Sequence, residues 1–361
     1  MGDNRLKMSV TVVTCFFNTT KERKTGRGGL NEYWKPEVYK TKNPMVIYGD
    51  PEYIEYARSQ RGDKLTEYHT MTMEQMELWK YKEQIDKNRQ VSWPTRDDRC
   101  PSSVHIICCS KILFFRDAIL SNPFGTDKFC FVDCNALGKS KASCIDLDER
   151  LSRVTDKFHT MIIGVPDKNA SYGELYNRYQ YILSGGIFAS GREIGLFMAD
   201  RFMEEFVKVT NAGYGHGEEM IWIKILYDHM DKLSLSYGDY SEFVTNFLEP
   251  LDNHHYILSY CITQYSNKRY YKELVCCCRK MLEVKMNADV HLDVLYYLYL
   301  GSYYLKNDRE IMYAIDEIKR LVKLGGEYAK VFEYKREMLR TNCEFVRHLY
   351  NGKNPFDDIS N

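Results

Sequence analysis

The chain has 361 residues, of which 44% are hydrophobic and 14% aromatic, so it can build the cores of about two domains. Its 50 basic and 50 acidic residues give a formal net charge of zero, which excludes the basic surface expected of a nucleic-acid-binding protein. No segment approaches the ~18 apolar residues of a membrane span, and the first residues lack the apolar core of a signal peptide. We therefore expect a soluble cytoplasmic protein with no nucleic-acid partner and no membrane span.

The first 250 residues alternate between strand and helix patterns. Runs of β-branched and apolar residues predict strands, and the helical pattern falls between them. The predicted strands are 9–18, 44–48, 128–133, 158–164 and 181–189. The predicted helices are 66–90, 103–121, 190–210 and 218–231. This alternation predicts an α/β sandwich with a mostly parallel central sheet, formed by residues 1–250.

Local signals predict where two of the helices begin and end. Ser102 or Ser103 can cap helix 103–121, and Asn122-Pro123 ends it. The capping-box pattern Ser190-x-x-Glu193 predicts the start of the helix that reaches Thr210. Each of the two serine caps would satisfy backbone N–H groups that a helix start leaves without partners.

Residues 254–350 carry helical periodicity without a strand pattern and predict a separate helical domain, followed by a polar, frayed tail at 351–361. Within it, the run Tyr297-x-x-Leu300-Gly301-x-x-Tyr304 fits the first helix of a tetratricopeptide-like unit. An ordinary helical hairpin explains the same run equally well. Such a domain offers a surface for a protein partner or for self-association.

Twelve cysteines are present, and none forms a Cys-x-x-Cys pair. Adjacent cysteines at 108–109 and 276–278 lie in helix-like runs, where neighbouring side chains point in different directions. We expect them to be free thiols that act as small buried hydrophobic residues in a reducing compartment, with disulfides as the less favoured interpretation.

The apolar run from Phe129 ends abruptly in Asp133, with the amide of Asn135 two residues further on. Open α/β sheets bind their ligands at the carboxyl ends of buried strands. Oxygen ligands placed there can hold Mn²⁺ or Mg²⁺ and, through it, a diphosphate. Taken alone, an Asp after a strand more commonly begins a turn.

Lys111 lies in the most apolar part of helix 103–121. Its helical neighbours are Val104, Ile107, Cys108, Phe114, Phe115 and Ala118. A buried lysine needs an anionic partner, or its pKa shifts sharply. The sequence leaves two interpretations open: Lys111 reaches a phosphate or a catalytic carboxylate, or it pairs with a structural Asp or extends to the surface.

Three further groups are candidates for the site. Gly185-Gly186 interrupts an apolar run, either to let a ligand approach the backbone or as a simple bulge. Glu218-Glu219 begins a helix, where acids are favoured by the helix dipole alone or can act as a base or sugar ligand. Arg23 and Arg27 follow the first strand, where they can meet a diphosphate or remain a solvated loop.

The candidate residues above, taken together with their flanking segments and in their order along the chain, resemble the HtrL/YibB-like family, whose members look like GT-A glycosyltransferases. The resemblance covers residues 9–248. It is carried by Thr11-Val12-Val13-Thr14-Cys15-Phe16-Phe17-Asn18, Asn43-Pro44-Met45-Val46-Ile47-Tyr48, Ser110-Lys111, Ala118-Ile119-Leu120-Ser121-Asn122-Pro123-Phe124, Phe131-Val132-Asp133, Gly185-Gly186, Glu218-Glu219 and Tyr237-Gly238-Asp239-Tyr240. The chain departs from the family pattern at Cys108-Cys109, at Cys134-Asn135 and at Met220.

The resemblance implies a metal-dependent glycosyltransferase, a hexosyl- or pentosyltransferase. It would move a sugar from a nucleotide-diphosphate sugar, by default UDP-linked, to a glycan or glycoprotein acceptor. Asp133 and Asn135 would hold Mn²⁺ or Mg²⁺, and Glu218 or Glu219 would be catalytic. The donor would be bound by Thr14, Phe16, Arg23, Arg27, Lys111, Asp133, Gly185 and Gly186.

Two further expectations follow from the same pattern. The lack of a membrane anchor suggests cytosolic glycosylation of a bacterial or viral type. The departures from the family pattern leave a second hypothesis, a non-catalytic carbohydrate- or protein-binding scaffold that retains the glycosyltransferase fold.

Overall fold

The computed structural model describes residues 10–20, 37–92, 100–140, 142–163, 171–176, 183–215, 217–238, 243–249, 262–263, 265–267, 269–283 and 286–357. The chain divides into two units, Met1–Pro250 and Leu251–Asn361.

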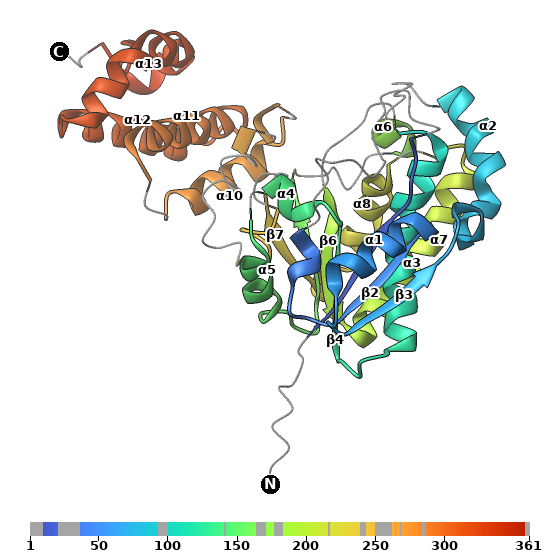
Figure 1. The fold of residues 1–361 in the computed structure, drawn as a ribbon. Coiled ribbons are helices and arrows are strands. Elements are labelled where there is room, and N and C mark those ends of the chain that lie inside the picture. The colour runs from blue at the N-terminus through green and yellow to red at the C-terminus, as the bar shows by residue number, and fades with distance from the viewer. Residues whose placement is uncertain are drawn as a thin grey trace. The chain divides into compact units, whose positions relative to one another are not determined.

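A seven-stranded sheet with the order β3-β2-β1-β4-β6-β5-β7 forms the centre of the first unit (Figure 1). Its strands are β1 Thr11–Phe16, β2 Met45–Gly49, β3 Thr66–Thr70, β4 Lys128–Val132, β5 Phe158–Ile162, β6 Leu183–Gly191 and β7 Leu233–Tyr237. All neighbouring pairs are parallel except those of β6, which runs antiparallel to β4 and β5. The predicted α/β class with a mostly parallel sheet is confirmed.

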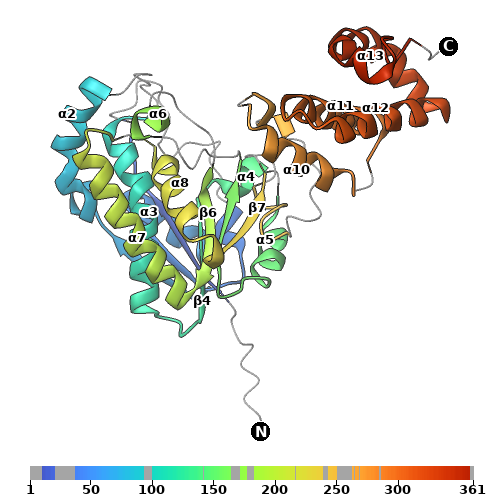
Figure 2. The same cartoon turned by 180° about the vertical axis from the view of Figure 1, so that it is seen from behind.

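Helices cover both faces of this sheet (Figure 2). They are α1 Pro51–Arg61, α2 Lys82–Ser92, α3 Ser102–Ser121, α4 Ala136–Ser140, α5 Cys144–Leu151, α6 Tyr172–Tyr176, α7 Arg192–Asn211 and α8 Glu218–Asp228, with 3-10 helices η1 Glu37–Lys40, η2 Met73–Gln75, η3 Glu77–Tyr81 and η4 Met230–Lys232. Apolar side chains of α3, α7 and α8 form the core on one face. Those of α1, α4 and α5 form the core on the other face.

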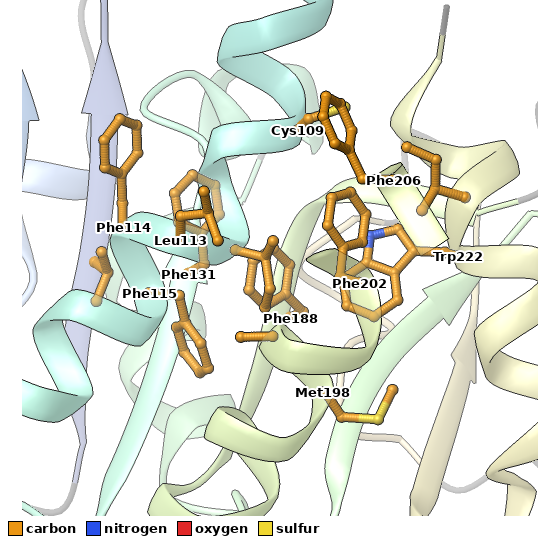
Figure 3. Close-up of a cluster of buried hydrophobic side chains, with 14 of the residues drawn as sticks. Cys109, Leu113, Phe114, Phe115, Phe131, Phe188, Met198, Phe202, Phe206 and Trp222 are labelled. Atoms are coloured by element: carbon orange, nitrogen blue, oxygen red, sulfur yellow. The ribbon is translucent and has the colours of Figure 1, made fainter. Parts of the chain in front are cut away.

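Aromatic rings fix α3 against β4 and β6 (Figure 3). The ring of Phe188 on β6 lies 5.1 Å from that of Phe131 on β4 and 5.2 Å from that of Phe115 on α3. On its other side it lies 5.7 Å from the ring of Phe158, which stacks on Trp222 of α8 at 5.2 Å. Close-packed rings of this kind allow little displacement, so the core sets the position of α3 relative to the carboxyl end of β4.

Two elements in the first third of the chain differ from the prediction. Residues 66–70 form the edge strand β3, not the start of a helix, and their β-branched and aromatic side chains suit that position. Helix α1 was not predicted, although Asp50-Pro51 signals its start. The Asp50 carboxylate accepts the N–H of Tyr53 at 3.0 Å, and Pro51 occupies the first turn.

The predicted serine caps are wrong, while the helix ends agree. Pro101 precedes α3 without a side-chain cap, and the Ser102 hydroxyl donates to Asp86 instead. Gly191 precedes α7, and Ser190 Oγ is buried without a hydrogen-bond partner among the described residues. Asn122 ends α3 in the left-handed region at φ 38°, as expected of a C-cap.

The second unit consists of α10 Tyr271–Met281, α11 Ala288–Tyr304, α12 Asp308–Lys323, α13 Glu327–Cys343 and the 3-10 helix η6 Glu344–Tyr350. Helices α10 and α11 approach closely at Gly301, where an added Cβ would lie 2.9 Å from Val275. The tetratricopeptide-like character stays a prediction. The described part of the tail, 351–357, is less frayed than expected, because Phe356 is buried and its ring lies 5.7 Å from that of Phe332.

The sequence predicts free thiols and no membrane span. The eleven cysteines among the described residues are all free thiols. None of their helices combines the length and the apolar character needed to cross a membrane.

A buried histidine in β5 predicts loss of stability in acid. His159 is 3% exposed, and burial together with the charge of Lys128 lowers its pKa from 6.5 to about 4. Below pH 6.5 the unfolded chain therefore binds a proton that the folded chain does not, and stability falls as the pH drops from 6.5 to about 4. The shift corresponds to about 3 kcal/mol.

This loss can be measured by urea unfolding at pH 7 and pH 4.5. All four tryptophans precede residue 250, so tryptophan fluorescence follows the first unit alone. The His159→Gln variant keeps an acceptor for the Thr155 N–H, which His159 Nε2 accepts at 2.9 Å, and should lose part of the acid sensitivity. An unchanged pH dependence in this variant would contradict the assignment.

Candidate functional site

A buried ion cluster lies at the carboxyl end of β4. Asp133 follows the last residue of β4, and Lys111 reaches it from the middle of α3. Lys111 Nζ lies 2.9 Å from Asp133 Oδ1 and 3.8 Å from Glu218 Oε1 at the start of α8. The Lys111 and Glu218 side chains are 10% and 9% exposed, whereas that of Asp133 is 26% exposed. We call Lys111, Asp133 and Glu218 the ion cluster; its most accessible member is Asp133.

The glycine pair on β6 brings backbone oxygens to this cluster. Thr160 of β5 pairs with Phe188, but the next residue, Met161, pairs with Ser184, so residues 185–187 are released from β5. The Gly185 carbonyl then accepts a hydrogen bond from Lys111 Nζ at 3.2 Å. The Gly186 carbonyl accepts the N–H of Asp133 at 2.7 Å. The irregularity therefore helps to build the site and is more than a local defect in pairing.

The site leaves no room for side chains at either glycine. A Cβ on Gly185 would lie 2.5 Å from Glu218 Oε1. A Cβ on Gly186 would lie 2.5 Å from Phe243 Cζ and 2.7 Å from Asp133 Oδ2. The sequence singled out these glycines for close approach, and the groups that approach them are side chains of the site itself.

We expect Gly185→Ala and Gly186→Ala to displace Glu218 and Asp133 and to destabilise the first unit by ~1–3 kcal/mol, because the new methyl group overpacks a close-packed site. Urea unfolding followed by tryptophan fluorescence measures the loss. Gly173→Ala is the matched control, because its Cβ would meet nothing closer than 3.4 Å. Equal stability of all three variants would contradict the tight fit.

The acidic pair begins α8, after Gly217 with its φ of 76°. Glu218 is 7% exposed and Glu219 is 3% exposed, so both carboxylates are withdrawn from solvent. A helix start favours acids through its dipole, but the dipole alone does not require that they be buried. Glu218 is the member of the pair that reaches Lys111.

The electrostatics of the cluster keep Lys111 charged. Burial by itself lowers the pKa of the ammonium, but the negative charges of Asp133 and Glu218 help raise that pKa well above its ordinary value. Burial also raises the pKa values of the Cys15 and Cys108 thiols well above the usual range, so both thiols stay neutral. The cluster is thus a fixed positive charge held between two carboxylates in a poorly solvated setting.

Sequence reasoning missed several neighbours of the cluster. The ring of Phe131 lies 5.9 Å from Lys111 Nζ. Cys15 is close enough for its thiol to interact electrostatically with Lys111, as is Cys108, which the sequence had already indicated as a helical neighbour. Phe131 and Cys15 could have been found, since alternation along β4 and β1 places them near the strand ends. Phe243 follows β7, and no local signal points to it.

Other predicted site residues lie outside the cluster. Thr14 is fully buried within β1, and its Oγ1 has no hydrogen-bond partner among the described residues. Phe16 ends β1, and its ring lies 4.8 Å from that of Tyr53. Asn135 precedes α4, and its Oδ1 faces the first turn of that helix, 2.8 Å from where a Cβ on Gly138 would lie. Arg23 and Arg27 fall outside the described residues.

The described residues do not form a metal site from protein groups alone. They contain no group of three or more His, Cys, Asp and Glu side chains that could hold an ion. One oxygen of Asp133 is engaged by Lys111, which leaves Oδ2 as the oxygen available to a cation. Asp133 and Asn135 were predicted to hold a metal ion together. Among the described residues, no contact between their two side chains supports this prediction.

Comparison with known proteins adds little to this geometry. No family model and no curated protein matches the sequence. Mouse xyloside xylosyltransferase 1 in its apo form is similar at a TM-score of 0.33 and 6% identity, over 67% of this chain and 94% of that one. The 4-diphosphocytidyl-2C-methyl-D-erythritol synthase of Anaerococcus prevotii DSM 20548 gives 0.34 and 10%, over 67% and 91%. Both TM-scores are low, so the HtrL/YibB resemblance rests on the sequence motifs alone.

Proposed function

We propose that the first unit is a GT-A-like glycosyltransferase that uses a nucleotide-diphosphate sugar, UDP-linked by default. The observation that carries this proposal is the ammonium of Lys111, held charged at the carboxyl end of β4 between Asp133 and Glu218. Ligands bind at this edge in open α/β sheets. A diphosphate leaving group develops negative charge as the glycosidic bond breaks, and a prepositioned cation stabilises that charge.

In this proposal Lys111 and the backbone around the glycine pair hold the donor. Because Asp133 and Gly185 already fix the ammonium, it can meet a phosphate oxygen without reorganising. The absence of side chains at Gly185 and Gly186 lets Glu218 and Asp133 lie against the backbone, so in this proposal the glycine pair contributes to donor binding by positioning these carboxylates. Thr14, Phe16, Arg23 and Arg27 keep their proposed roles as further donor contacts.

A cation fits this site when it is shared with the donor. Mg²⁺ and Mn²⁺ are commonly bound by one or two carboxylates together with substrate phosphates, which suits the available Oδ2 of Asp133. Such an ion, when bound, would neutralise charge on the diphosphate. Asn135 is the weaker candidate ligand, because its oxygen faces the first turn of α4.

Glu218 and Glu219 are the proposed acid–base or sugar-binding groups. Both are buried at the start of α8, and Glu218 Oε1 lies 3.8 Å from Lys111 Nζ. A carboxylate in this position can accept the proton of an acceptor hydroxyl or hydrogen-bond the hydroxyls of the donor sugar.

The test is nucleotide release from a panel of uridine- and guanosine-diphosphate sugars, with Mn²⁺, with Mg²⁺ and with chelator. We expect release from at least one donor by the wild type, its loss with chelator, and its loss in Asp133→Ala. Asp231→Ala removes an exposed carboxylate and serves as the control. Full activity of Asp133→Ala on a working donor would overturn the role of Asp133.

The scaffold hypothesis keeps one specific observation in its favour: Lys111 has carboxylates on two sides, as a purely structural ion pair does. Thermal-shift measurements separate the two hypotheses. Stabilisation by a nucleoside diphosphate together with Mn²⁺ is expected of the enzyme. The scaffold predicts no such shift with any common nucleotide.

A further inference from the structure

The aromatic ring of Phe243 meets the ion cluster at Asp133. Phe243 begins the segment 243–249 after β7. Its Cζ and Asp133 Oδ2 lie 2.5 Å and 2.7 Å from the same point, where a Cβ on Gly186 would stand. No other atom of the ring comes closer to that point than 3.1 Å, so the ring is presented end-on. The ring edge of Phe243 and the outer oxygen of Asp133 are therefore neighbours above the Cα of Gly186.

The segment 243–249 holds this ring firmly in place. Phe243 is 1% exposed and Phe247 is fully buried, and both belong to the core on the α1, α4 and α5 face of the sheet. The N–H of Leu248 donates to the buried Oγ of Ser236 on β7 at 2.9 Å. Leu248 has a φ of 64°, a left-handed conformation that a leucine keeps only where its surroundings enforce it. The ring thus forms a fixed wall of the site.

The oxygen that this wall faces has no protein partner. Among the described residues, no hydrogen-bond donor reaches Asp133 Oδ2, whereas Oδ1 lies 2.9 Å from Lys111 Nζ. Phe243 presents to Oδ2 a ring edge, which carries partial positive charge but no N–H or O–H group. A polar residue in this position would pair with Oδ2. The phenyl ring instead limits the movement of the carboxylate and leaves this oxygen unpaired.

The charge of the ion cluster gives the unpaired oxygen its importance. Asp133 and Glu218 place two carboxylates beside the single ammonium of Lys111. The resulting net negative charge disfavours a diphosphate until a further cation joins the cluster. Mg²⁺ and Mn²⁺ are bound by one or two carboxylates together with substrate phosphates, and Oδ2 is the oxygen of Asp133 that remains for such a bond.

We propose that Phe243 is a positioning residue of the donor site, which holds Asp133 with Oδ2 free of protein partners so that this oxygen can share a divalent cation with a diphosphate. The identity of the ligand rests on the proposed function, whereas the contact between Phe243 and Asp133 does not. Because Phe243 acts through Asp133, its replacement should change how strongly the cation promotes nucleotide binding.

The first test is isothermal titration of the full chain with UDP, with and without Mn²⁺. Phe243→Tyr adds a hydroxyl to the ring carbon that faces Oδ2, where it would donate to this oxygen and compete with the cation. We expect the gain in UDP affinity from Mn²⁺ to fall about tenfold, the effect of one hydrogen bond of ~1.4 kcal/mol. UDP affinity without Mn²⁺ should stay unchanged.

A leucine pair separates positioning from packing. Phe243→Leu removes the ring edge without adding a polar group, so Asp133 is held less firmly and the gain from Mn²⁺ should again fall. Phe247→Leu is the matched control, because it shortens another buried ring of the same segment and core. This control should lose stability but keep the gain of the wild type. An equal gain in both leucine variants and the wild type would overturn the proposal.

The second test reports the contact without any ligand. Urea unfolding followed by tryptophan fluorescence gives the stability of Phe243→Leu, of Asp133→Asn and of the double variant. If the ring edge holds Asp133, the losses in the two single variants are not additive, and the double variant loses less than their sum. Additive losses would show that Phe243 only fills the core and would overturn the proposal.

The two tests distinguish failure of this inference from failure of the proposed function. If Mn²⁺ did not promote UDP binding to the wild type, the proposed function would be refuted, and the donor role of Phe243 with it. The unfolding measurements would still decide whether Phe243 holds Asp133. If Mn²⁺ promoted UDP binding equally in the wild type and in Phe243→Leu, only the role of Phe243 would be refuted.

Discussion

Replacement of Lys111 by methionine is expected to lower donor turnover by on the order of 10²–10³-fold, the effect of removing one preorganised electrostatic group. It should also destabilise the first unit by ~3–5 kcal/mol, since it leaves buried carboxylates facing each other without their cation. Asp133 and Glu218 supply those carboxylates. Nucleotide release and urea unfolding measure the two effects separately.

A double variant separates catalysis from folding. Lys111→Met/Glu218→Gln removes the cation together with one of the two charges that it pairs, so we expect it to recover much of the lost stability but none of the activity. Lys208→Met is the control, because that side chain is 65% exposed on α7. If activity returned in step with stability, Lys111 would be a structural residue only.

Replacement of Arg61 by lysine is expected to destabilise the first unit by at least ~3 kcal/mol. Arg61 is 2% exposed, and its guanidinium uses all five donors within the protein. The acceptors are the Tyr39, Thr41, Asn43 and Leu65 carbonyls and Thr66 Oγ1, at 2.9 to 3.1 Å. They lie in the segments that lead into β2 and β3, so Arg61 fixes where both strands begin.

The reason for this large effect is geometric. A lysine ammonium has three donors at one point and cannot span acceptors arranged around a planar fork, so buried carbonyls would remain unpaired at ~1–3 kcal/mol each. Arg58→Lys on the same helix is the control, since its side chain is 52% exposed and the change should cost less than ~1 kcal/mol. Similar losses for the two variants would show that the hydrogen bonds of Arg61 contribute little.

The sequence predicted much of the fold because its core strands are strongly apolar. The runs at β1, β2 and β4 are nearly continuous in apolar residues, as parallel strands buried on both faces require. The prediction for β3 was wrong because β3 is a short edge strand with half-exposed side chains. A helix can show the same pattern of exposed and buried residues. α1 was missed although Asp50-Pro51 carried its start signal.

The sequence singled out the residues of the ion cluster one by one, but it did not predict which of them contact one another. The apolar setting of Lys111 required an anionic partner, and Asp133 at a strand end offered one. That Glu218 is a second partner depends on how α8 packs beside β6, which no local pattern encodes. The contact of Gly186 with Asp133 arises because β6 runs antiparallel next to β4, and strand order is a property of the whole chain.

The burial of the Ser110 hydroxyl and the ring contact of His69 lie beyond sequence reasoning altogether. Ser110 was noted only as the neighbour of Lys111, and nothing in its surroundings along the chain shows that its hydroxyl lacks a partner. His69 was placed in a predicted helix, whereas its position on β3 brings its ring onto Tyr48. Buried polar atoms without partners become visible only when the packing of all elements is known.

Isothermal titration of UDP, with and without Mn²⁺, tests the central claim most directly, that the ion cluster is a diphosphate site. We expect UDP to bind the wild type more tightly with Mn²⁺ than without it. We expect no measurable binding to the Lys111→Met/Glu218→Gln variant under conditions where its unfolding curve shows it to be folded. Equal affinity of UDP for the two folded proteins would contradict the account.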